Sequence, residues 1–275
     1  MPGDAGADIA LHVAVQGVGP PLIMLHGFTG SAETLEAMAS SLQRDFTVYR
    51  VDLVGHGRSA APADAACYTM DSCLAQLCAL LDSLDIARAH WLGYSMGARV
   101  VLSLCAAHPE RVCSALLIGA SPGIAEPELR AERVAADAAL ARRLRERGIG
   151  DFVDYWMALP LFASQRRLGA AYWQRQRGLR LANRAEALAA SLTGMGCGAM
   201  APLHSALPAI TCPVCLVVGA EDEKFLGIAQ AMAARLPRAQ VAVVAGAGHA
   251  AHLEQAQACT DVIRAFFNSP SACAE

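Results

Sequence analysis

The chain has 275 residues, of which 55% are hydrophobic and 17% are charged; this composition excludes a disordered protein and suits one sizeable α/β domain. The net charge is −3 and no block of Lys and Arg is interleaved with aromatic residues, which excludes the usual electrostatic footprint of a nucleic-acid-binding protein. No apolar stretch reaches the roughly 18 residues that cross a bilayer, and Asp4 and Asp8 stand where an export signal would be basic and apolar, so we expect a soluble, unexported, cytoplasmic protein with no membrane partner.

Apolar runs, taken in chain order, predict the strands of a sheet. Residues 9–15 alternate apolar and polar side chains, as a half-buried strand does, and residues 17–21 form a turn. The later runs are continuously apolar, which is typical of strands buried on both faces of a parallel sheet. These runs are residues 22–25, 47–53, 90–93, 115–119, 214–218 and 241–244.

Helical periodicity fills most of the intervals between these runs. Because strands and helices alternate, the sequence predicts an α/β fold with a mostly parallel sheet, right-handed crossovers and flanking helices. The predicted helices are residues 32–43, 70–84, 98–108, 227–236 and 256–267.

The alternation fails between residues 119 and 210, where the sequence has helical periodicity and a cluster of Trp and Tyr. Residues 124–205 contain twelve Arg and eight acidic residues, a net charge of +4, whereas the rest of the chain carries −7. We interpret this segment as a helical cap inserted into one α/β domain. The chain then divides into a first core part, a cap and a second core part, at residues 1–123, 124–205 and 206–275.

Residues 93–97, Gly-Tyr-Ser-Met-Gly, have the GxSxG pattern, with a predicted strand before them and a predicted helix after them. Such a segment forms a nucleophile elbow, a sharp turn that lifts the serine Oγ above the end of the sheet. The glycines are needed because the backbone passes close to its neighbours. The alternative is a serine that only caps the helix N-terminus. We predict that Ser95 is the reactive residue.

A nucleophile elbow predicts an acid and then a histidine, each directly after a later strand. Asp222 follows the run that ends at residue 218, and His249 lies in a glycine-rich turn after the last run. His249 would take the Ser95 proton while Asp222 holds the other ring nitrogen. Alternatives remain at neighbouring positions, namely Glu221 and Glu223 for the acid and His252 for the base.

Residues 25–31, Leu-His-Gly-Phe-Thr-Gly-Ser, place flexible backbone beside the elbow, after the first continuous strand. This position predicts an oxyanion hole formed by the backbone N–H groups of Phe28 and Met96. The alternative is an ordinary strand-to-helix turn, which is also our interpretation of residues 52–57.

Two other motifs do not indicate a cofactor. Residues 194–199 fit GxGxxA, but they follow a helical stretch rather than a strand, so we interpret them as a bend within the cap. Cys212 and Cys215 form a CxxC motif that leads into a strand, which does not favour a redox or zinc role. The ten cysteines, Cys273 included, are expected to be reduced core thiols. No metal and no organic cofactor is predicted.

The elbow, the late acid and the final histidine on an α/β alternation with a helical insertion resemble the α/β-hydrolase superfamily over nearly the whole chain. Further stretches, in their joint order, are similar to the 2-succinyl-6-hydroxy-2,4-cyclohexadiene-1-carboxylate (SHCHC) synthase family of menaquinone biosynthesis. They are LHGFTGS at 25–31, GYSMGAR at 93–99, PLF at 160–162, SLTGMG at 191–196, GAEDEKF at 219–225 and AGHAAHLE at 247–254.

This resemblance implies a lyase that eliminates pyruvate from 2-succinyl-5-enolpyruvyl-6-hydroxy-3-cyclohexene-1-carboxylate, with the Ser, Asp and His side chains abstracting a proton. It also implies three arginines that grip the substrate carboxylates. Arg99 matches the first of these, and Arg133 and Arg180 in the cap match the other two. A helix that starts at the elbow places Arg99 one turn from Ser95, where the helix dipole disfavours a cation unless an anion binds there.

Tyr94, Trp156 and Phe162 are candidate walls for the apolar part of the substrate, with packing inside the cap as the alternative. The runner-up function is a serine hydrolase of a small carboxylated ester, thioester or carbon–carbon bond substrate, because the same three residues serve both chemistries. A non-catalytic binding protein is disfavoured because all three positions are filled. The expected partner is a small anionic molecule, and the sequence does not indicate an oligomeric state.

Overall fold

The computed structural model describes residues 9–269, which form a sheet of seven strands in the order β1-β3-β2-β4-β5-β6-β7. Neighbouring strands are parallel except for β1, which runs antiparallel to β3 at one edge. The carboxyl ends of the parallel strands therefore meet at one edge of the sheet. The strands are β1 (Val13–Gln16), β2 (Pro21–Leu25), β3 (Thr47–Val51), β4 (Ala89–Tyr94), β5 (Val112–Ile118), β6 (Val214–Gly219) and β7 (Ala239–Val244).

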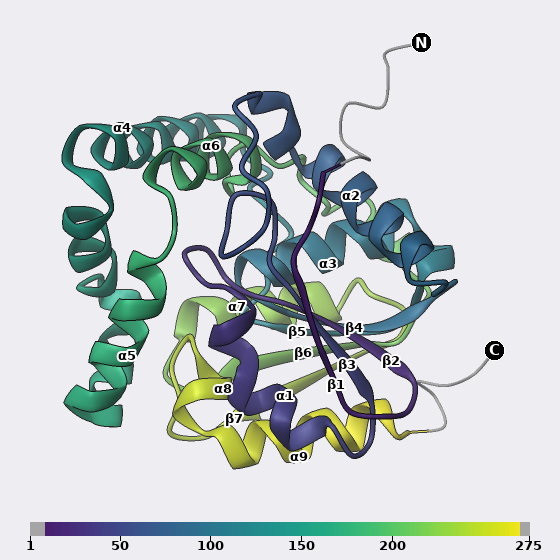
Figure 1. The fold of residues 1–275 in the computed structure, drawn as a ribbon. Coiled ribbons are helices and arrows are strands. Elements are labelled where there is room, and N and C mark those ends of the chain that lie inside the picture. The colour runs from purple at the N-terminus through teal and green to yellow at the C-terminus, as the bar shows by residue number, and fades with distance from the viewer. Residues whose placement is uncertain (1–8, 270–275) are drawn as a thin grey trace, which may run out of the picture.

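Helices cover both faces of the sheet, so the predicted α/β architecture is confirmed (Figure 1). One apolar core lies between the sheet and α2, α3 and α7. A second core lies on the opposite face, against α1 and α9. The bounds of these elements and of the short helices are α1 (Glu36–Leu42), α2 (Met70–Ser83), α3 (Met96–Ala107), α7 (Glu223–Ala233), α8 (Ala251–Glu254), α9 (Ala256–Phe267), η1 (Ala32–Leu35), η2 (Ala65–Tyr68), η3 (Pro109–Arg111) and η5 (Leu207–Ala209).

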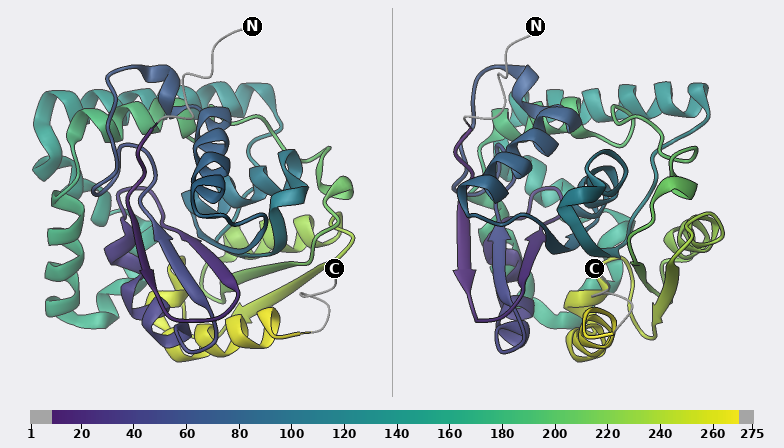
Figure 2. Two further views of the ribbon diagram at one scale, coloured as in Figure 1. Left: turned by 45° about the vertical axis from the view of Figure 1, so that its right-hand side comes forward. Right: turned by 90° about the vertical axis from the view of Figure 1, so that its right-hand side faces the viewer.

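The segment between β5 and β6 is helical and forms a separate arm beside the sheet, at the left and top of Figure 1. It comprises α4 (Pro127–Met157), η4 (Pro160–Leu168), α5 (Gly169–Leu181) and α6 (Ala185–Met195). Gly148 interrupts α4 with a positive φ of 76°, and α4 and α6 pack on each other through a small apolar core of their own. Figure 2 shows this arm from two further sides. The division at residues 124 and 205 stays a prediction.

The predicted strands and helices occur where periodicity places them, with two differences at the edges of the sheet. The first strand begins at Val13, because residues 9–12 run as a loop whose backbone accepts hydrogen bonds from Asp52 and Ala60. The expectation that residues 241–244 are buried on both faces is wrong. β7 is the outermost strand, and Val243 is 51% exposed there.

The nine cysteines within residues 9–269 form no disulfide bonds with one another, and five of them are buried. Cys273 lies outside the described residues, as do Asp4 and Asp8. Over residues 9–269, none of the helices combines the length and the apolar character needed to cross a bilayer.

Candidate active site

Ser95 lies at the sharp turn between β4 and α3. Its backbone has φ 52° and ψ −105°, a strained conformation for a residue with a side chain. A Cβ atom at Gly93 would collide with the backbone of Gly97 and Ala98, and one at Gly97 would collide with the backbone of Leu25. The two glycines are therefore required for the turn, as the elbow interpretation expects.

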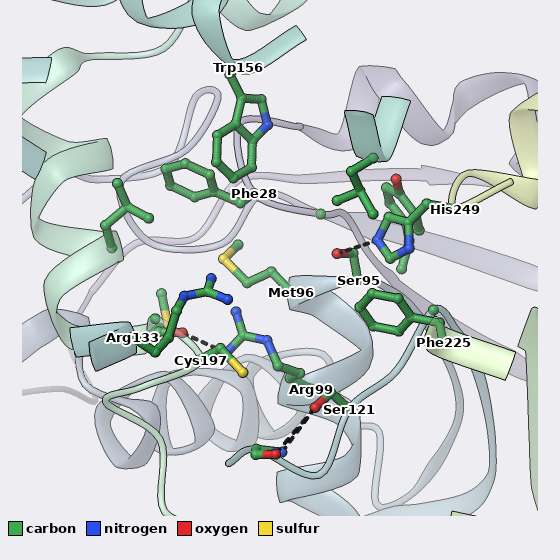
Figure 3. Close-up of a pocket in the computed structure, with 18 of the residues that line it drawn as sticks. Phe28, Ser95, Met96, Arg99, Ser121, Arg133, Trp156, Cys197, Phe225 and His249 are labelled. Atoms are coloured by element: carbon green, nitrogen blue, oxygen red, sulfur yellow. Dashed lines mark hydrogen bonds between the residues drawn. The ribbon is translucent and has the colours of Figure 1, made fainter. Parts of the chain in front are cut away.

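Ser95, His249 and Asp222 form one hydrogen-bonded chain. His249 Nε2 lies 3.0 Å from Ser95 Oγ (Figure 3). On the other side of the ring, His249 Nδ1 lies 2.7 Å from Asp222 Oδ2. Asp222 also caps α7, because its Oδ1 accepts a hydrogen bond from the backbone N–H of Phe225. Gly119, with φ 63°, leaves the space in which the His249 ring sits. The three residues thus come from three loops at the carboxyl edge of the sheet.

The alternative residues are placed elsewhere. Glu221 forms an ion pair with Arg167 of the cap, and Glu223 is an exposed residue in the first turn of α7. His252 is buried with its ring 4.4 Å from that of Tyr94, and its Nδ1 has no hydrogen-bond partner within residues 9–269.

His252 and His56 should make the folded state sensitive to acid. Burial, with a second histidine nearby, lowers the pKa of each to about 3. Between that value and the ordinary 6.5 the unfolded chain binds the protons and the folded chain does not, so the free energy of unfolding falls as the pH is lowered. The pKa shift of each ring should lower the free energy of unfolding by about 2 kcal/mol between pH 7 and pH 5.

We therefore expect His252→Phe to reduce the loss of stability between pH 7 and pH 5 by about 2 kcal/mol relative to the wild type. Urea unfolding at both pH values measures this difference. His108→Gln, at a half-exposed histidine, serves as the control and should leave the pH dependence unchanged. An equal pH dependence in His252→Phe and the wild type would contradict the expectation.

The two backbone donors expected for an oxyanion hole flank Ser95. Met96 is the first residue of α3, and Phe28 lies in the loop after β2. Neither backbone N–H donates to another group within residues 9–269. The Phe28 ring packs edge-on against Trp156 and Phe152 of the cap, so cap residues hold the loop that carries one donor.

A pocket of about 410 Å³ opens over Ser95, between the sheet edge and the cap. Every residue that the sequence singles out for the site lines it, apart from Asp222, which lies behind His249. Those lining residues are Phe28, Tyr94, Ser95, Met96, Arg99, Arg133, Trp156, Phe162, Arg180 and His249.

Arg99 and Arg180 bring positive charge into this pocket without an acidic partner. Arg99 Nη1 donates to the carbonyl of Met195 at 2.8 Å, and Arg180 Nη1 donates to the carbonyl and side-chain oxygens of Gln176. No carboxylate within residues 9–269 lies within ion-pair distance of either side chain. Burial lowers the pKa of both guanidinium groups, because charge is costly away from water. An anion in the pocket would relieve this cost.

Arg133 differs from these two arginines because its charge is already paired. Its Nε lies 2.9 Å from Asp137 Oδ1, four residues further along α4. In Figure 3 its guanidinium group points toward that of Arg99, and the Cys197 thiol lies beside them. The remaining guanidinium nitrogens of Arg133 and Arg99 therefore form one end of the pocket, away from Trp156 and Phe28.

The aromatic candidates line the pocket and also contact other aromatic side chains. Trp156 stacks on Phe152 and contacts Phe162, and it also lines the pocket with Phe162. Tyr94 lies between His249 and His252, and burial raises the pKa of its phenol. These side chains are core and wall at once.

Other pocket residues were missed by sequence reasoning. Met195, Gly196 and Cys197 belong to the GxGxxA segment that we interpret as a bend, and this bend forms part of the pocket wall. Lys224, the chain's single lysine, lies in the pocket wall two residues after Asp222. Its uniqueness and its position were signals that could have identified it. Ser191 belongs to the SLTGMG stretch quoted for the family resemblance, whereas Ser121 and Ile124 carried no signal in the sequence.

Three or more His, Cys, Asp or Glu side chains in a metal-binding arrangement are not found within residues 9–269. Cys212 is half-buried and precedes β6, whereas Cys215 is buried within β6.

Comparisons with known proteins place these features in context. A family model described as alpha/beta hydrolase fold matches residues 20–256. The 2-succinyl-6-hydroxy-2,4-cyclohexadiene-1-carboxylate synthase of Salmonella typhimurium is 32% identical over 253 residues, which cover 92% of this chain and 95% of that protein. A Bacillus subtilis protein that bears the same name provisionally is 36% identical over 248 residues, 90% of each chain. The structure of MenH from S. aureus matches with a TM-score of 0.89 at 30% identity, covering 94% of this chain and 97% of that one.

Proposed function

The chain belongs to the α/β-hydrolase fold family and, within it, to the SHCHC synthases, and from this premise we propose that it eliminates pyruvate from 2-succinyl-5-enolpyruvyl-6-hydroxy-3-cyclohexene-1-carboxylate in menaquinone biosynthesis. The product is SHCHC, and the reaction is a lyase reaction. The observation that carries the proposal is the pair of arginines, Arg99 and Arg180, which line the Ser95 pocket with no acidic partner in the described chain. A substrate with three carboxylates would supply the missing negative charge.

In this reaction Ser95 acts as a base rather than as an acylated nucleophile. His249 takes the Ser95 proton while Ser95 Oγ removes the ring proton next to the succinyl carbonyl, and Asp222 stabilises the imidazolium that forms. The two hydrogen bonds of His249, 3.0 Å and 2.7 Å long, support this transfer. The backbone N–H groups of Phe28 and Met96 would hold the enolate oxygen.

The enolate then expels the enolpyruvyl group. The enolate electrons form a ring double bond at the carbon that lost its proton, the existing ring double bond shifts toward the carbon that bears the enolpyruvyl group, and the ring carbon–oxygen bond breaks. Pyruvate leaves as its enolate, which takes up the proton held on His249 and so restores the neutral imidazole. Arg99 and Arg133 at one end of the pocket and Arg180 in the cap would hold carboxylates of the substrate in place. Tyr94, Trp156 and Phe162 would pack against its apolar parts.

The experiment that tests this proposal follows pyruvate release from the enolpyruvyl cyclohexene substrate with coupled lactate dehydrogenase. An activated ester is assayed in parallel, and Ser95→Ala is the control for both. We expect rapid, serine-dependent pyruvate release with negligible ester turnover. Ester turnover without pyruvate, with an acyl group trapped on Ser95, would make the serine hydrolase the correct function. A cytoplasmic location stays a prediction, which cell fractionation would test.

A further inference from the structure

One cap residue contacts both of the loops that carry Asp222 and His249. Arg167, in η4, donates to Glu221 through two hydrogen bonds of 2.8 Å each. Its Nη2 also donates to Glu254 Oε2 at 3.3 Å. Glu221 directly precedes Asp222 in the chain, so the guanidinium group of Arg167 is fixed beside the loop of the candidate acid.

Glu254 connects Arg167 to the loop of the candidate base. Its side chain is only 3% exposed, and its carboxylate accepts hydrogen bonds from the backbone N–H of Gly248 at 2.9 Å and of Ala250 at 3.3 Å. These two residues flank His249 on either side. Arg167 therefore joins the neighbours of Asp222 to the neighbours of His249, alongside the 2.7 Å bond between the two side chains themselves.

The same turn of η4 contacts the histidine loop a second time. Arg167 Nε donates to the carbonyl of Ser164 at 3.1 Å. A Cβ atom at Gly248 would collide with the Ser164 side chain, so the turn lies directly on the backbone beside His249. Phe162, from the start of this segment, lines the pocket. The η4 segment of the cap therefore contacts both the Asp222 loop and the His249 loop.

The contribution of the Arg167–Glu221 ion pair to stability should be small. Arg167 is 52% exposed and Glu221 is 45% exposed, and exposed pairs of this kind contribute about 0–1 kcal/mol. The bidentate geometry nevertheless fixes the relative orientation of the two groups, because a planar guanidinium can hold a carboxylate at only one angle. The expected consequence is alignment of the loops rather than stability.

We propose that Arg167 is a positioning residue that holds the Asp222 and His249 loops in register from the cap. It touches neither substrate nor reacting atoms, and it acts through Glu221 and Glu254. The inference rests on the proposed function only in that Ser95, His249 and Asp222 are taken to work together. It therefore holds for either a lyase or a hydrolase.

A fluorophosphonate probe tests this inference, because phosphonylation of Ser95 requires an aligned His249 and Asp222 but no carboxylate binding. We expect Arg167→Ala to lower the second-order rate constant of labelling at least about tenfold, since a 1 Å misplacement of a catalytic group can cost about 100-fold. Arg167→Lys, which keeps the charge but cannot form both bonds to Glu221, should give an intermediate rate. Kinetics with the cyclohexene substrate should show the loss in kcat with KM little changed.

Arg166→Ala is the matched control, because Arg166 is an exposed neighbour on the same segment with no ion pair within residues 9–269. It should label at the wild-type rate, and the melting temperature of all variants should stay within about 2 °C of the wild type. Labelling of Arg167→Ala at the wild-type rate would overturn the inference. A loss shared with Arg166→Ala, or one that follows a lower melting temperature, would also overturn it. Normal labelling of the wild type without pyruvate release would instead contradict only the proposed function.

Discussion

Replacing Ser95 with alanine is expected to lower kcat for pyruvate release about 10²- to 10⁴-fold, the range that general base catalysis contributes. The reason is geometric. His249 Nε2 has Ser95 Oγ as its partner at 3.0 Å, and without the hydroxyl the imidazole has no group through which to reach the ring proton. Coupled assay of pyruvate release measures kcat, and isothermal titration calorimetry with the product measures binding, which should be retained.

A second substitution tests whether Asp222, rather than a neighbouring acidic residue, is the acid that holds His249. Asp222→Asn should produce a loss of similar size, because an amide can stabilise neither the imidazolium nor the required tautomer. Glu223→Gln is the matched control at the exposed residue that follows Asp222 in the chain, and it should leave kcat unchanged.

The Ser95 prediction has its own contradicting outcome. If Ser95→Ala keeps kcat within tenfold of the wild type, Ser95 is not the base of this reaction.

Arg99→Met should lower kcat/KM and raise stability at the same time. Losing a desolvated charged hydrogen bond to a carboxylate costs about 2–5 kcal/mol, which lowers kcat/KM by a factor of at least about 30. Without a ligand, however, the hydrogen-bond partners of Arg99 within residues 9–269 are the Met195 carbonyl and the sulfur of Met200. Replacing a partly buried charge that has no acidic partner with an apolar side chain should raise the free energy of unfolding by about 1–2 kcal/mol.

Urea unfolding and steady-state kinetics of the same preparations test both halves of this prediction. Arg142→Met makes the same chemical change at an exposed position on α4, where Arg142 has no ion pair within residues 9–269. It should leave both kcat/KM and stability near the wild-type values. A less stable Arg99→Met protein would show that Arg99 has a structural role in place of, or in addition to, substrate binding.

The sequence predicts the parts of this fold that depend on local pattern. Apolar runs and helical periodicity locate the strands and helices. The GxSxG segment locates the turn at Ser95, because the two glycines that the turn requires lie within two residues of the serine in the sequence. The exposure of β7 could not be predicted in the same way, because a short run of valines occurs both in central strands and in edge strands, and the pattern alone does not distinguish them.

The site itself depends on contacts between distant segments. Sequence order could place an acid near residue 222, but only the three-dimensional structure shows that Asp222 faces His249 while Glu221 faces Arg167. Arginines are dense in the cap, and their sequence positions do not show which ones lack an acidic partner. Arg133 is paired with Asp137, whereas Arg180 donates to Gln176 and forms no ion pair with any other residue in the range 9–269. The catalytic roles of these residues stay predictions.

The insertion of the cap between β5 and β6 also sets the order in which the protein can become active during folding. The hydrogen bond between Ser95 and His249 joins residues 154 positions apart, and closing so long a loop is entropically costly and slow. A nascent chain that has already formed its elbow therefore remains inert until β6 and β7 dock. In refolding, we expect helical circular dichroism to recover before Ser95 becomes reactive to a fluorophosphonate, so that reactivity of this serine reports completion of the last two strands.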